Sequence, residues 1–297
     1  MAIVVGAAPP PAPTHSDRDP LSRTVVAEYV IEPSRGGVHF GLGELWAYRE
    51  LLYFLVWRDL KVRYAQTILG VAWAVVQPLL TTVIFTVVFG RLARVPSDGI
   101  PYPIFALAAL VPWTYVSTAY SGAGASVLNN ANLITKVYFP RLVVPFAPVG
   151  AATVDFGVGL ILLAIALGIY RLVPSPWALV VVPSAIVAFA LTAAGVGCWV
   201  SALSVQYRDV KVLVPFLTTM WMYVSPVIYP LSRVPPRWQL AYALNPLAGT
   251  LAAFRAALVG REIDWSAWWV SVAAALVVFV SGATYFRRTE RMFADIV

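Results

Sequence analysis

Six stretches of the chain are long and uncharged enough to cross the hydrocarbon core of a membrane. A helix needs about 20 residues to span the roughly 30 Å core. Unpaired backbone amides are costly in lipid, so each stretch is predicted to be helical. The composition agrees, because 60% of the residues are hydrophobic and 12% are charged. We therefore expect an all-α integral membrane protein with six transmembrane helices, at residues 64–90, 104–128, 142–170, 174–205, 212–229 and 265–286.

The cations flanking these windows predict the orientation of the chain. With both termini in the cytosol, the inner flanks carry more cations than the outer flanks, as the positive-inside rule requires. The inner cations are Arg49, Arg58, Lys61, Arg63, Lys136, Arg141, Arg208, Lys211, Arg287, Arg288 and Arg291. The outer cations are Arg91, Arg94, Arg171, Arg233, Arg237, Arg255 and Arg261. We expect a multi-pass membrane protein with both termini in the cytosol.

Two apolar segments are too short or too broken to span. Residues 42–58 place apolar residues at helical spacing, with charged residues elsewhere. The apolar set is Leu45, Tyr48, Leu52, Leu55 and Val56, and the charged set is Glu44, Arg49, Glu50 and Arg58. This pattern predicts an amphipathic helix on the inner interface. Residues 236–260 are divided by Asn245-Pro246 into two pieces, each shorter than a span. A re-entrant helical hairpin on the outer side, between the fifth and sixth spans, is predicted there.

Four parts follow along the chain. Residues 1–41 are predicted to be a disordered cytosolic tail, and residues 42–63 the interface helix with an elbow. Residues 64–287 form the six-helix transmembrane domain, which includes the re-entrant segment. Residues 288–297 form a cytosolic C-terminal tail.

The residues exclude several classes of function. The single cysteine, Cys198, lies in an apolar window, and His15 and His39 both precede the first window, so no metal site is expected. No paired carboxylates or Ser/His arrangement lie in the spans, and the chain has no GxxxxGK[ST] phosphate loop. The cations are scattered between apolar runs, which favours contact with membrane lipids over nucleic acid. The sequence therefore predicts no enzyme and no cofactor held by this chain.

Asp155 is the one ionisable residue inside the windows. It could serve as a coupling or substrate carboxylate, or as a helix residue satisfied by the hydroxyls of a neighbouring helix or by an arginine. The residues alone leave both interpretations open.

Polar and aromatic side chains recur on one face of the first and fifth windows. Such stripes either pack helices together or line a passage for sugars, since aromatic faces stack on pyranose rings while amides and hydroxyls bond their edges. Aromatic residues of the second window either join this lining or belong to an interfacial belt. The candidates are Gln66, Trp73, Gln77, Thr81, Trp113, Tyr115, Tyr120, Thr218, Trp221, Ser225 and Tyr229.

Six ordered motifs resemble a known family. They are "YRELLYFLVWRDLKVRYAQTILGVAWAVVQPLL", "LVPWTYVSTA", "NANLITKVYFPRLVVP", "VQYRDVKVLVPFL", "SPVIYP" and "LNPLAGTLAAFRAAL". Together they resemble the permease subunit of the ABC exporters for O-antigen, teichoic acid and related cell-surface polysaccharides, over roughly residues 44 to 287. The resemblance implies two permease copies forming a channel, with two separate ATPase subunits that bind ATP and Mg²⁺. A lipid-linked polysaccharide would be the substrate, with O-antigen, teichoic acid and cell-wall galactan all open.

The segment "NANLITKVYFPRLVVP" matches the cytosolic loop of this family that docks on the ATPase. The resemblance makes Tyr138 and Phe139 the anchors, with Lys136 and Arg141 available to pair with acids. The full set expected at this contact is Asn132, Lys136, Val137, Tyr138, Phe139, Pro140 and Arg141, with Arg58, Asp59 and Arg63 at the elbow. A solvated loop with positive-inside charge is the alternative. A second inner turn holds Arg208 and Asp209, which could pair with each other or with the interface helix.

Two other functions compete with polysaccharide export. A type 2 ABC permease for a drug, antibiotic or lipid shares the topology but offers an apolar cavity. A membrane-bound glycosyltransferase would need outward-facing catalytic acids, and the outer loops offer Asp98, Glu262 and Asp264 without an evident constellation.

Overall fold

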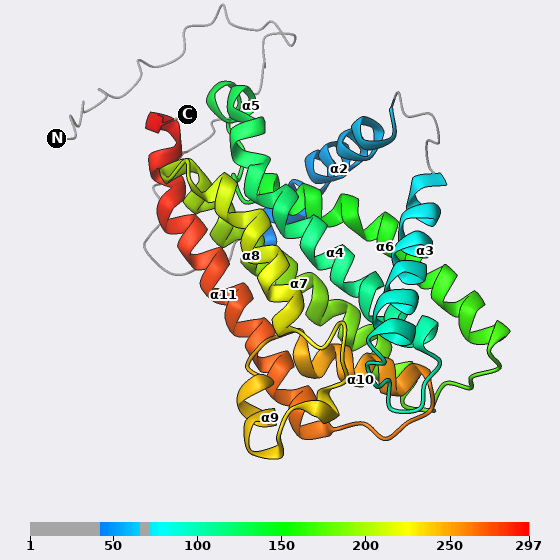
Figure 1. Ribbon diagram of the computed structural model, residues 1–297. Coiled ribbons are helices and arrows are strands. Elements are labelled where there is room, and N and C mark those ends of the chain that lie inside the picture. The colour runs from blue at the N-terminus through cyan, green and yellow to red at the C-terminus, as the bar shows by residue number, and fades with distance from the viewer. Residues whose placement is uncertain (1–41, 66–71, 297) are drawn as a thin grey trace, which may run out of the picture. The chain divides into compact units, whose positions relative to one another are not determined.

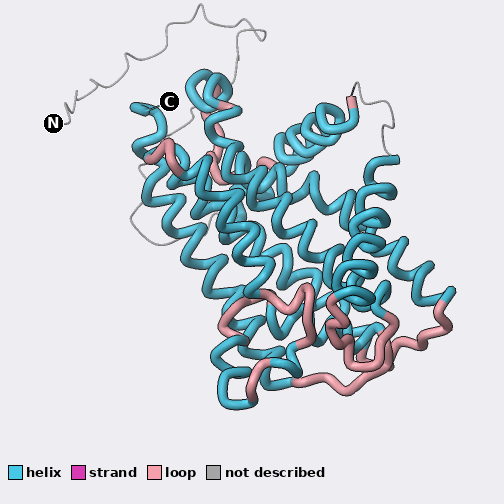
Figure 2. Tube along the Cα trace, in the orientation of Figure 1, coloured by secondary structure: helices cyan, strands magenta, loops and turns pink. Residues whose placement is uncertain are grey.

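The computed structural model describes residues 42–65 and 72–296, and every regular element in these ranges is helical. The predicted tail at 1–41 lies outside the described residues. Figure 1 traces the helices and Figure 2 shows that the connecting loops gather mainly at one end of the bundle. That end carries α9 and is called the α9 end. The opposite end carries α2, α5 and the C-terminal part of α11 and is called the α5 end.

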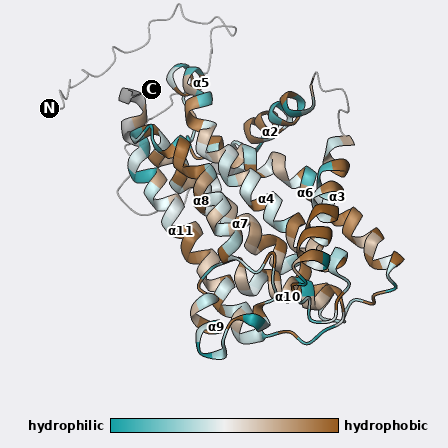
Figure 3. Cartoon of the chain, viewed as in Figure 1, coloured by the Kyte–Doolittle hydropathy of each residue, from teal (hydrophilic) through white to brown (hydrophobic). Residues whose placement is uncertain are grey.

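Five helices are long and apolar enough to cross a membrane. They are α3 (Trp73–Phe85) with its π-helical continuation η2 (Thr86–Leu92), α4 (Tyr102–Asn129), α6 (Val143–Ile169), α7 (Ala178–Gln206) and α11 (Trp265–Ile296). Figure 3 shows apolar colour along much of these helices and hydrophilic colour at α5, α2 and α9. An all-helical membrane fold is thereby confirmed.

The predicted fifth span is shorter than expected. Helix α8 (Val210–Val224) has 15 residues and ends where Ser225 adopts an extended backbone. Pro226 follows, and proline disfavours helical geometry in the residue before it. The prediction of one continuous helix to residue 229 is therefore wrong. At 1.5 Å per residue, α8 covers about 22 Å, which is less than the hydrocarbon core.

Helix α4 is the centre of the bundle. It packs against α6 on one side and α7 on another, and α7 in turn packs against α11. Most of the apolar residues of α4 are buried, including Phe105, Val116 and Ala119. By contrast, α3 buries Thr82 alone and α8 buries no residue within this chain. These two helices therefore present wide apolar faces outward.

The helix predicted for the membrane interface is longer than expected and includes the elbow residues. Helix α1 (Leu42–Ala47) is followed by α2 (Arg49–Tyr64), so residues 59–63 are helical and the turn comes at Ala65. One face of α2 packs on α6 through Leu55 and Val56, while Tyr53, Phe54 and Trp57 are exposed. Apolar side chains therefore occur on both the packed and the exposed side of α2, which differs from the expected separation of apolar and charged faces.

The segment at 236–260 is divided at the predicted point. Helix α9 (Pro236–Tyr242) and helix α10 (Ala248–Leu258) flank a turn that contains Asn245 and Pro246. A short 3₁₀ helix, η3 (Leu231–Arg233), precedes them. Helix α10 packs on α11 and α7. The predicted C-terminal tail is not separate, because α11 continues as a helix to Ile296.

Candidate functional site

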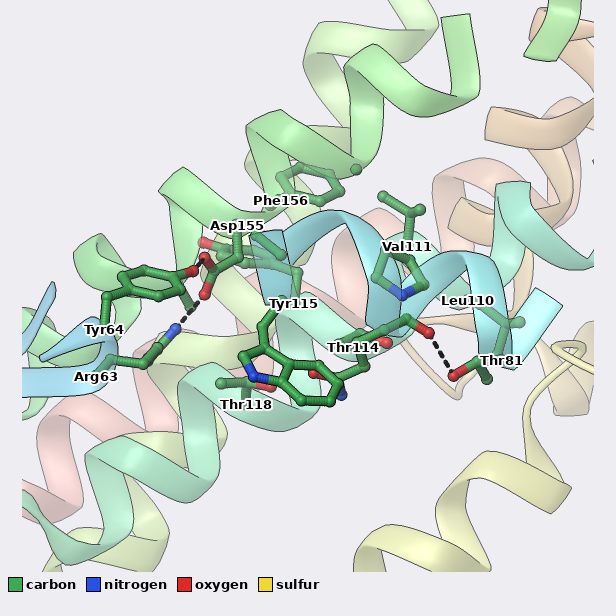
Figure 4. Close-up of a pocket in the computed structure, with 16 residues that line it drawn as sticks. Arg63, Tyr64, Thr81, Leu110, Val111, Thr114, Tyr115, Thr118, Asp155 and Phe156 are labelled. Atoms are coloured by element: carbon green, nitrogen blue, oxygen red, sulfur yellow. Dashed lines mark hydrogen bonds and ion pairs between the residues drawn. The ribbon is translucent and has the colours of Figure 1, made fainter. Parts of the chain in front are cut away.

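A cavity of about 270 Å³ lies where the end of α2 meets α3, α4 and α6 (Figure 4). It is called the elbow cavity. Its wall combines charged, hydroxyl and aromatic side chains: Arg63, Tyr64, Trp73, Gln77, Thr81, Thr114, Tyr115, Thr118, Asp155 and Phe156, with six smaller or apolar residues between them. Four of these, Trp73, Gln77, Thr81 and Tyr115, are residues that the sequence places in the passage.

Asp155 stands at one side of this cavity and is held by two neighbours from α2. Its carboxylate forms an ion pair with Arg63 and accepts a hydrogen bond from the Tyr64 hydroxyl (Figure 4). Burial, the hydrogen bond to Asp155 and the negative charge of Asp155 raise the pKa of Tyr64 to about 12. Of the two sequence interpretations of Asp155, the structure therefore favours satisfaction by an arginine and a hydroxyl. Arg63, which the sequence analysis placed at the ATPase contact, makes this ion pair within the chain.

The opposite side of the cavity is formed by α3 and α4. Trp73 and Gln77 are exposed on α3, and the Thr81 hydroxyl donates to the Gln77 carbonyl at 2.9 Å. Thr114 and Thr118 of α4 add two exposed hydroxyls that the sequence reasoning missed. Their spacing of four residues, with Tyr115 between them, is the signal that could have found them. The ring of Tyr115 stacks on Phe156 at 4.7 Å between centroids.

The predicted stripe of α8 forms hydrogen bonds within this chain. The Trp221 indole donates to the Asn245 side-chain oxygen at 3.0 Å, and the Asn245 amide donates to the Ser225 hydroxyl at 2.9 Å. The Tyr120 hydroxyl donates to Thr218, and Trp113 packs edge-on against Trp221 at 5.9 Å.

Trp113, Tyr120 and Ser225 are buried within this chain. In this structure these members of the predicted lining serve helix packing, because membrane helices use such hydrogen bonds to hold neighbours together. Tyr229 likewise bonds Tyr242 of α9 through their hydroxyls at 2.8 Å.

Gln66, another residue of the predicted lining, lies outside the described residues. Asn245, which joins α8 to the turn before α10, was missed as a bonding residue, although its place before Pro246 marked it as a helix break.

The predicted docking segment forms a projection at the α5 end. Helix α5 (Ala131–Lys136) follows a break at Asn130, and residues 137–142 lead back into α6. Asn132, Lys136 and Val137 are exposed, and Tyr138 is 90% exposed.

Phe139 corrects the expectation of two projecting aromatic anchors. It is only 5% exposed and belongs to a buried cluster with Leu142, Val143 and Phe293. Phe139 therefore fills part of the chain's own core. Tyr138 is therefore the projecting aromatic residue.

Two arginines near this projection, Arg58 and Arg141, bond to other parts of the chain. Arg58 pairs with Asp59 at 2.8 Å and donates to the side-chain oxygen of Asn130 at 2.7 Å, which joins α2 to the break before α5. Arg141 donates to the backbone carbonyl of Glu290, and Pro140 is partly buried. Asn130 was missed, and its position in the run "NNAN" between two apolar windows was the available signal.

The predicted pairing of Arg208 and Asp209 is not formed. Both side chains are exposed, and neither makes an ion pair or side-chain hydrogen bond with any residue in the described ranges. Asp209 precedes α8, where its carbonyl accepts the backbone N–H groups of Val212 and Leu213. The backbone orders this turn without the side chains.

Metal-binding chemistry has no evident site in the described part of the chain. Within residues 42–65 and 72–296, no group of three or more histidine, cysteine, aspartate or glutamate residues is placed to hold a metal ion. Cys198 is free and buried.

Comparison with known proteins points to membrane transport. Residues 50–259 match the ABC-2 type transporter family. The chain is 29% identical over 258 residues to the O-antigen export system permease protein RfbA of Myxococcus xanthus, covering 86% of this chain and 98% of that protein. It is 26% identical over 261 residues to the protein of the same name from Klebsiella pneumoniae, covering 87% and 98%. It is 21% identical over 243 residues to the polysialic acid transport protein KpsM of Escherichia coli, covering 80% and 93%.

Proposed function

Since the chain belongs to the ABC-2 type transporter family, we propose that it is the permease subunit of an ABC exporter for a lipid-linked polysaccharide. It would move this polysaccharide from the cytosol across the bacterial inner membrane. Two relatives named as O-antigen export permeases, each matched over nearly its full length, support this substrate class. The chain itself is a transport protein and not an enzyme.

The proposed topology has six spans. The fifth in chain order is α8, whose 15 helical residues would be extended across the membrane by the non-helical segment 225–229. Both termini, α2 and α5 would lie on the cytosolic side, supported by the excess of cations that the sequence places there. Helices α9 and α10 would enter the membrane from the outer side and return to that same side. Their lengths of 7 and 11 residues are too short to span.

Two copies of the chain are proposed to form the export channel. The wide apolar faces of α3 and α8, unburied within one chain, are available for a second copy or for lipid. Large exposed apolar surfaces of this kind mark interfaces or contact with the membrane.

Two ATPase subunits, which would bind ATP and Mg²⁺, are proposed to dock at the α5 end. The exposed side chains Asn132, Lys136, Val137 and Tyr138 support that contact, since an exposed aromatic residue beside a cation is typical of a protein-binding surface. ATP binding would close the two ATPases and move the docked segments. The helices α3 and α8 of the two copies would then part or close around the glycan.

The elbow cavity is the observation that carries the choice of a sugar substrate. A hydrated polymer cannot enter hydrocarbon, so polar groups must replace its water along the route. The cavity offers an indole, an amide and hydroxyl groups together, from Trp73, Gln77, Thr114 and Thr118. A purely apolar cavity would suit a drug or lipid better.

Replacement of the exposed cavity residues tests this proposal. The double change Trp73→Ala and Gln77→Ala is expected to reduce surface display of the glycan at least about tenfold, because stacking and hydrogen-bonding groups worth roughly 1 kcal/mol each are removed at every copy. Ile161→Ala, which removes an exposed apolar side chain of α6, is the matched control. Normal export by the double variant, with the permease and ATPase still purified together, would refute the lining role.

A further inference from the structure

A second group of hollows lies at the α9 end and shares no lining residue with the elbow cavity. One, of about 760 Å³, is called the Arg255 cavity and is lined by α10, η3, the turn at residues 98–100 and the segment before α11. The other, of about 400 Å³, is called the tryptophan hollow and is lined by Trp177, Trp265 and the segment 260–263. Arg261 and Glu262 line both hollows, which are therefore adjacent.

Arg255 is the most buried polar residue that lines the first hollow. The side chain is 4% exposed, and its charge lies 3.6 Å from the centre of the Phe105 ring. One terminal nitrogen donates to the Pro226 carbonyl at 3.0 Å, whereas Nε has no acceptor among the described residues. Buried cations are ordinarily paired or fully hydrogen-bonded. This guanidinium has no carboxylate within ion-pair distance in the described part of the chain, so the cavity contains an incompletely bonded donor.

The acidic residues of the cavity divide into engaged and free groups. Asp98 accepts from the Ser232 hydroxyl at 2.9 and 3.0 Å, and Asp264 accepts from the first turn of α11. Glu262 is exposed and makes no side-chain hydrogen bond within the described ranges. Arg261, its neighbour, is also exposed. A free acceptor and a free donor therefore stand side by side where the two hollows meet.

The tryptophan hollow adds flat aromatic surface. Trp177 and Trp265 meet edge to face, with 5.2 Å between ring centroids, and are 58% and 38% exposed. Their exposed ring faces lie in the same hollow as Glu262 and Arg261.

We propose that these two hollows form a binding site for neutral sugar units of the exported glycan. A neutral sugar uses both donors and acceptors, and its apolar ring face packs on an indole. A phosphate or other anion would meet three carboxylates, at Asp98, Glu262 and Asp264, against two arginines. An acyl chain would leave all of these charges without partners. The volume of the Arg255 cavity falls within the roughly 300–1,000 Å³ of small-molecule sites.

This assignment rests on the proposed function and orientation, in which the α9 end faces outward. The glycan would then reach these hollows as it leaves the channel. Arg255 and Glu262 would bond its hydroxyl groups, and Trp177 would stack on a ring.

Photo-crosslinking of the full-length permease in glycan-producing cells tests the site directly. The photoreactive amino acid p-benzoylphenylalanine is placed at Gln239, which lines the Arg255 cavity, or at Leu240, the next residue of α9, which is exposed and lines neither hollow. After irradiation, the purified permease is stained for carbohydrate by periodate oxidation. A glycan adduct at Gln239 at least about fivefold above that at Leu240 is the expected result. Equal yields at the two positions would overturn the site.

Glu262→Ala in the Gln239 background provides the second arm. Loss of one acceptor, worth about 0.5–1.5 kcal/mol, should lower the adduct yield by about 2- to 10-fold. Glu262 is exposed, so the fold should be unaffected. An unchanged yield would overturn the role of Glu262 in binding.

Surface glycan is measured in the same cells to separate this proposal from the proposed function. Normal export with no preference for Gln239 would reject the outer site and leave the exporter assignment intact. If cells that lack the chain still display the glycan, both proposals fail.

Discussion

Arg63, in the last turn of the interface helix α2, forms an ion pair with Asp155 in the middle of α6 (Figure 4). The two residues are 92 positions apart in the sequence. The pair joins the helix that would lie on the membrane surface to a helix that would cross it. It also forms one wall of the elbow cavity, so a shift of α2 would alter the lining of that cavity.

A double-mutant cycle measures how strongly this pair holds the two helices. Both side chains are about a third exposed, at 32% and 28%. Each of Asp155→Asn and Arg63→Gln is therefore expected to lower the free energy of unfolding by about 1–3 kcal/mol, less than for a fully buried pair. The double variant should lose clearly less than the two single losses combined, measured as thermal unfolding of the purified protein. Simple addition of the two losses would show that the residues act independently.

Tyr64 makes the same contact sensitive to alkaline pH. Its pKa is raised from 10.0 to about 12, first by burial and then by its hydrogen bond to Asp155. The folded chain thus holds this proton more tightly than the unfolded chain. The stabilisation is fully present below pH 10 and is lost as the pH rises through about 12.

Tyr64→Phe isolates this contribution from the other tyrosines. The difference in thermal midpoint between the native protein and the variant should be constant up to pH 10 and shrink from there toward pH 12. Parallel pH curves for the two proteins would contradict the assignment. The ultraviolet absorbance of ionised tyrosine, followed in the same samples, should show one fewer late-titrating group in the variant.

Adjacent residues Tyr138 and Phe139 should give opposite phenotypes. Tyr138 is 90% exposed and Phe139 is 5% exposed. Tyr138→Ala should leave thermal stability within about 0.5 kcal/mol of the native value but reduce copurification of the ATPase subunit. Phe139→Ala should cost about 3–5 kcal/mol of stability, because it opens a void in the cluster around Leu142 and Phe293. Intact ATPase binding by the Tyr138 variant would remove this residue from the docking surface.

These two residues also show where prediction from sequence ends. The window lengths and the break at Asn245-Pro246 identified the helical membrane fold, since hydropathy and proline act locally. Which of two neighbouring aromatics is buried depends on α11, more than 140 residues later, through Phe293. The same holds for Asp155: an arginine partner could be foreseen, but its identity as Arg63 depends on how α2 packs on α6.

The surroundings of the stripe on α8 could not be predicted for a related reason. Its spacing correctly placed Thr218, Trp221 and Ser225 on one face, but helical periodicity does not say what that face meets. In the structure it meets α4 and the turn before α10, where Tyr120 and Asn245 satisfy its polar groups. The face of α3 that carries Trp73, Gln77 and Thr81 lines the elbow cavity instead.

The crossing of α7 and α11 depends on two glycines that touch. A Cβ atom on Gly282 would lie 2.1 Å from the Gly195 carbonyl oxygen, and one on Gly195 would lie 2.6 Å from the backbone of Phe279. In both cases the obstacle is backbone, which cannot rotate away as a side chain can. The helices would have to separate, disturbing the Trp199–Tyr285 stack at 4.3 Å beside the crossing.

Gly282→Ala is therefore expected to destabilise the protein by about 1–3 kcal/mol despite alanine's higher helix propensity. Gly168→Ala, in the last turn of α6, is the matched control because a Cβ there meets nothing within 4 Å. It should be neutral or stabilising by up to about 1 kcal/mol, since alanine restricts the unfolded chain. Thermal unfolding of the two variants in the same detergent decides the matter. If both shift the midpoint alike, helix propensity outweighs the close approach of the backbones, and the crossing tolerates a methyl group.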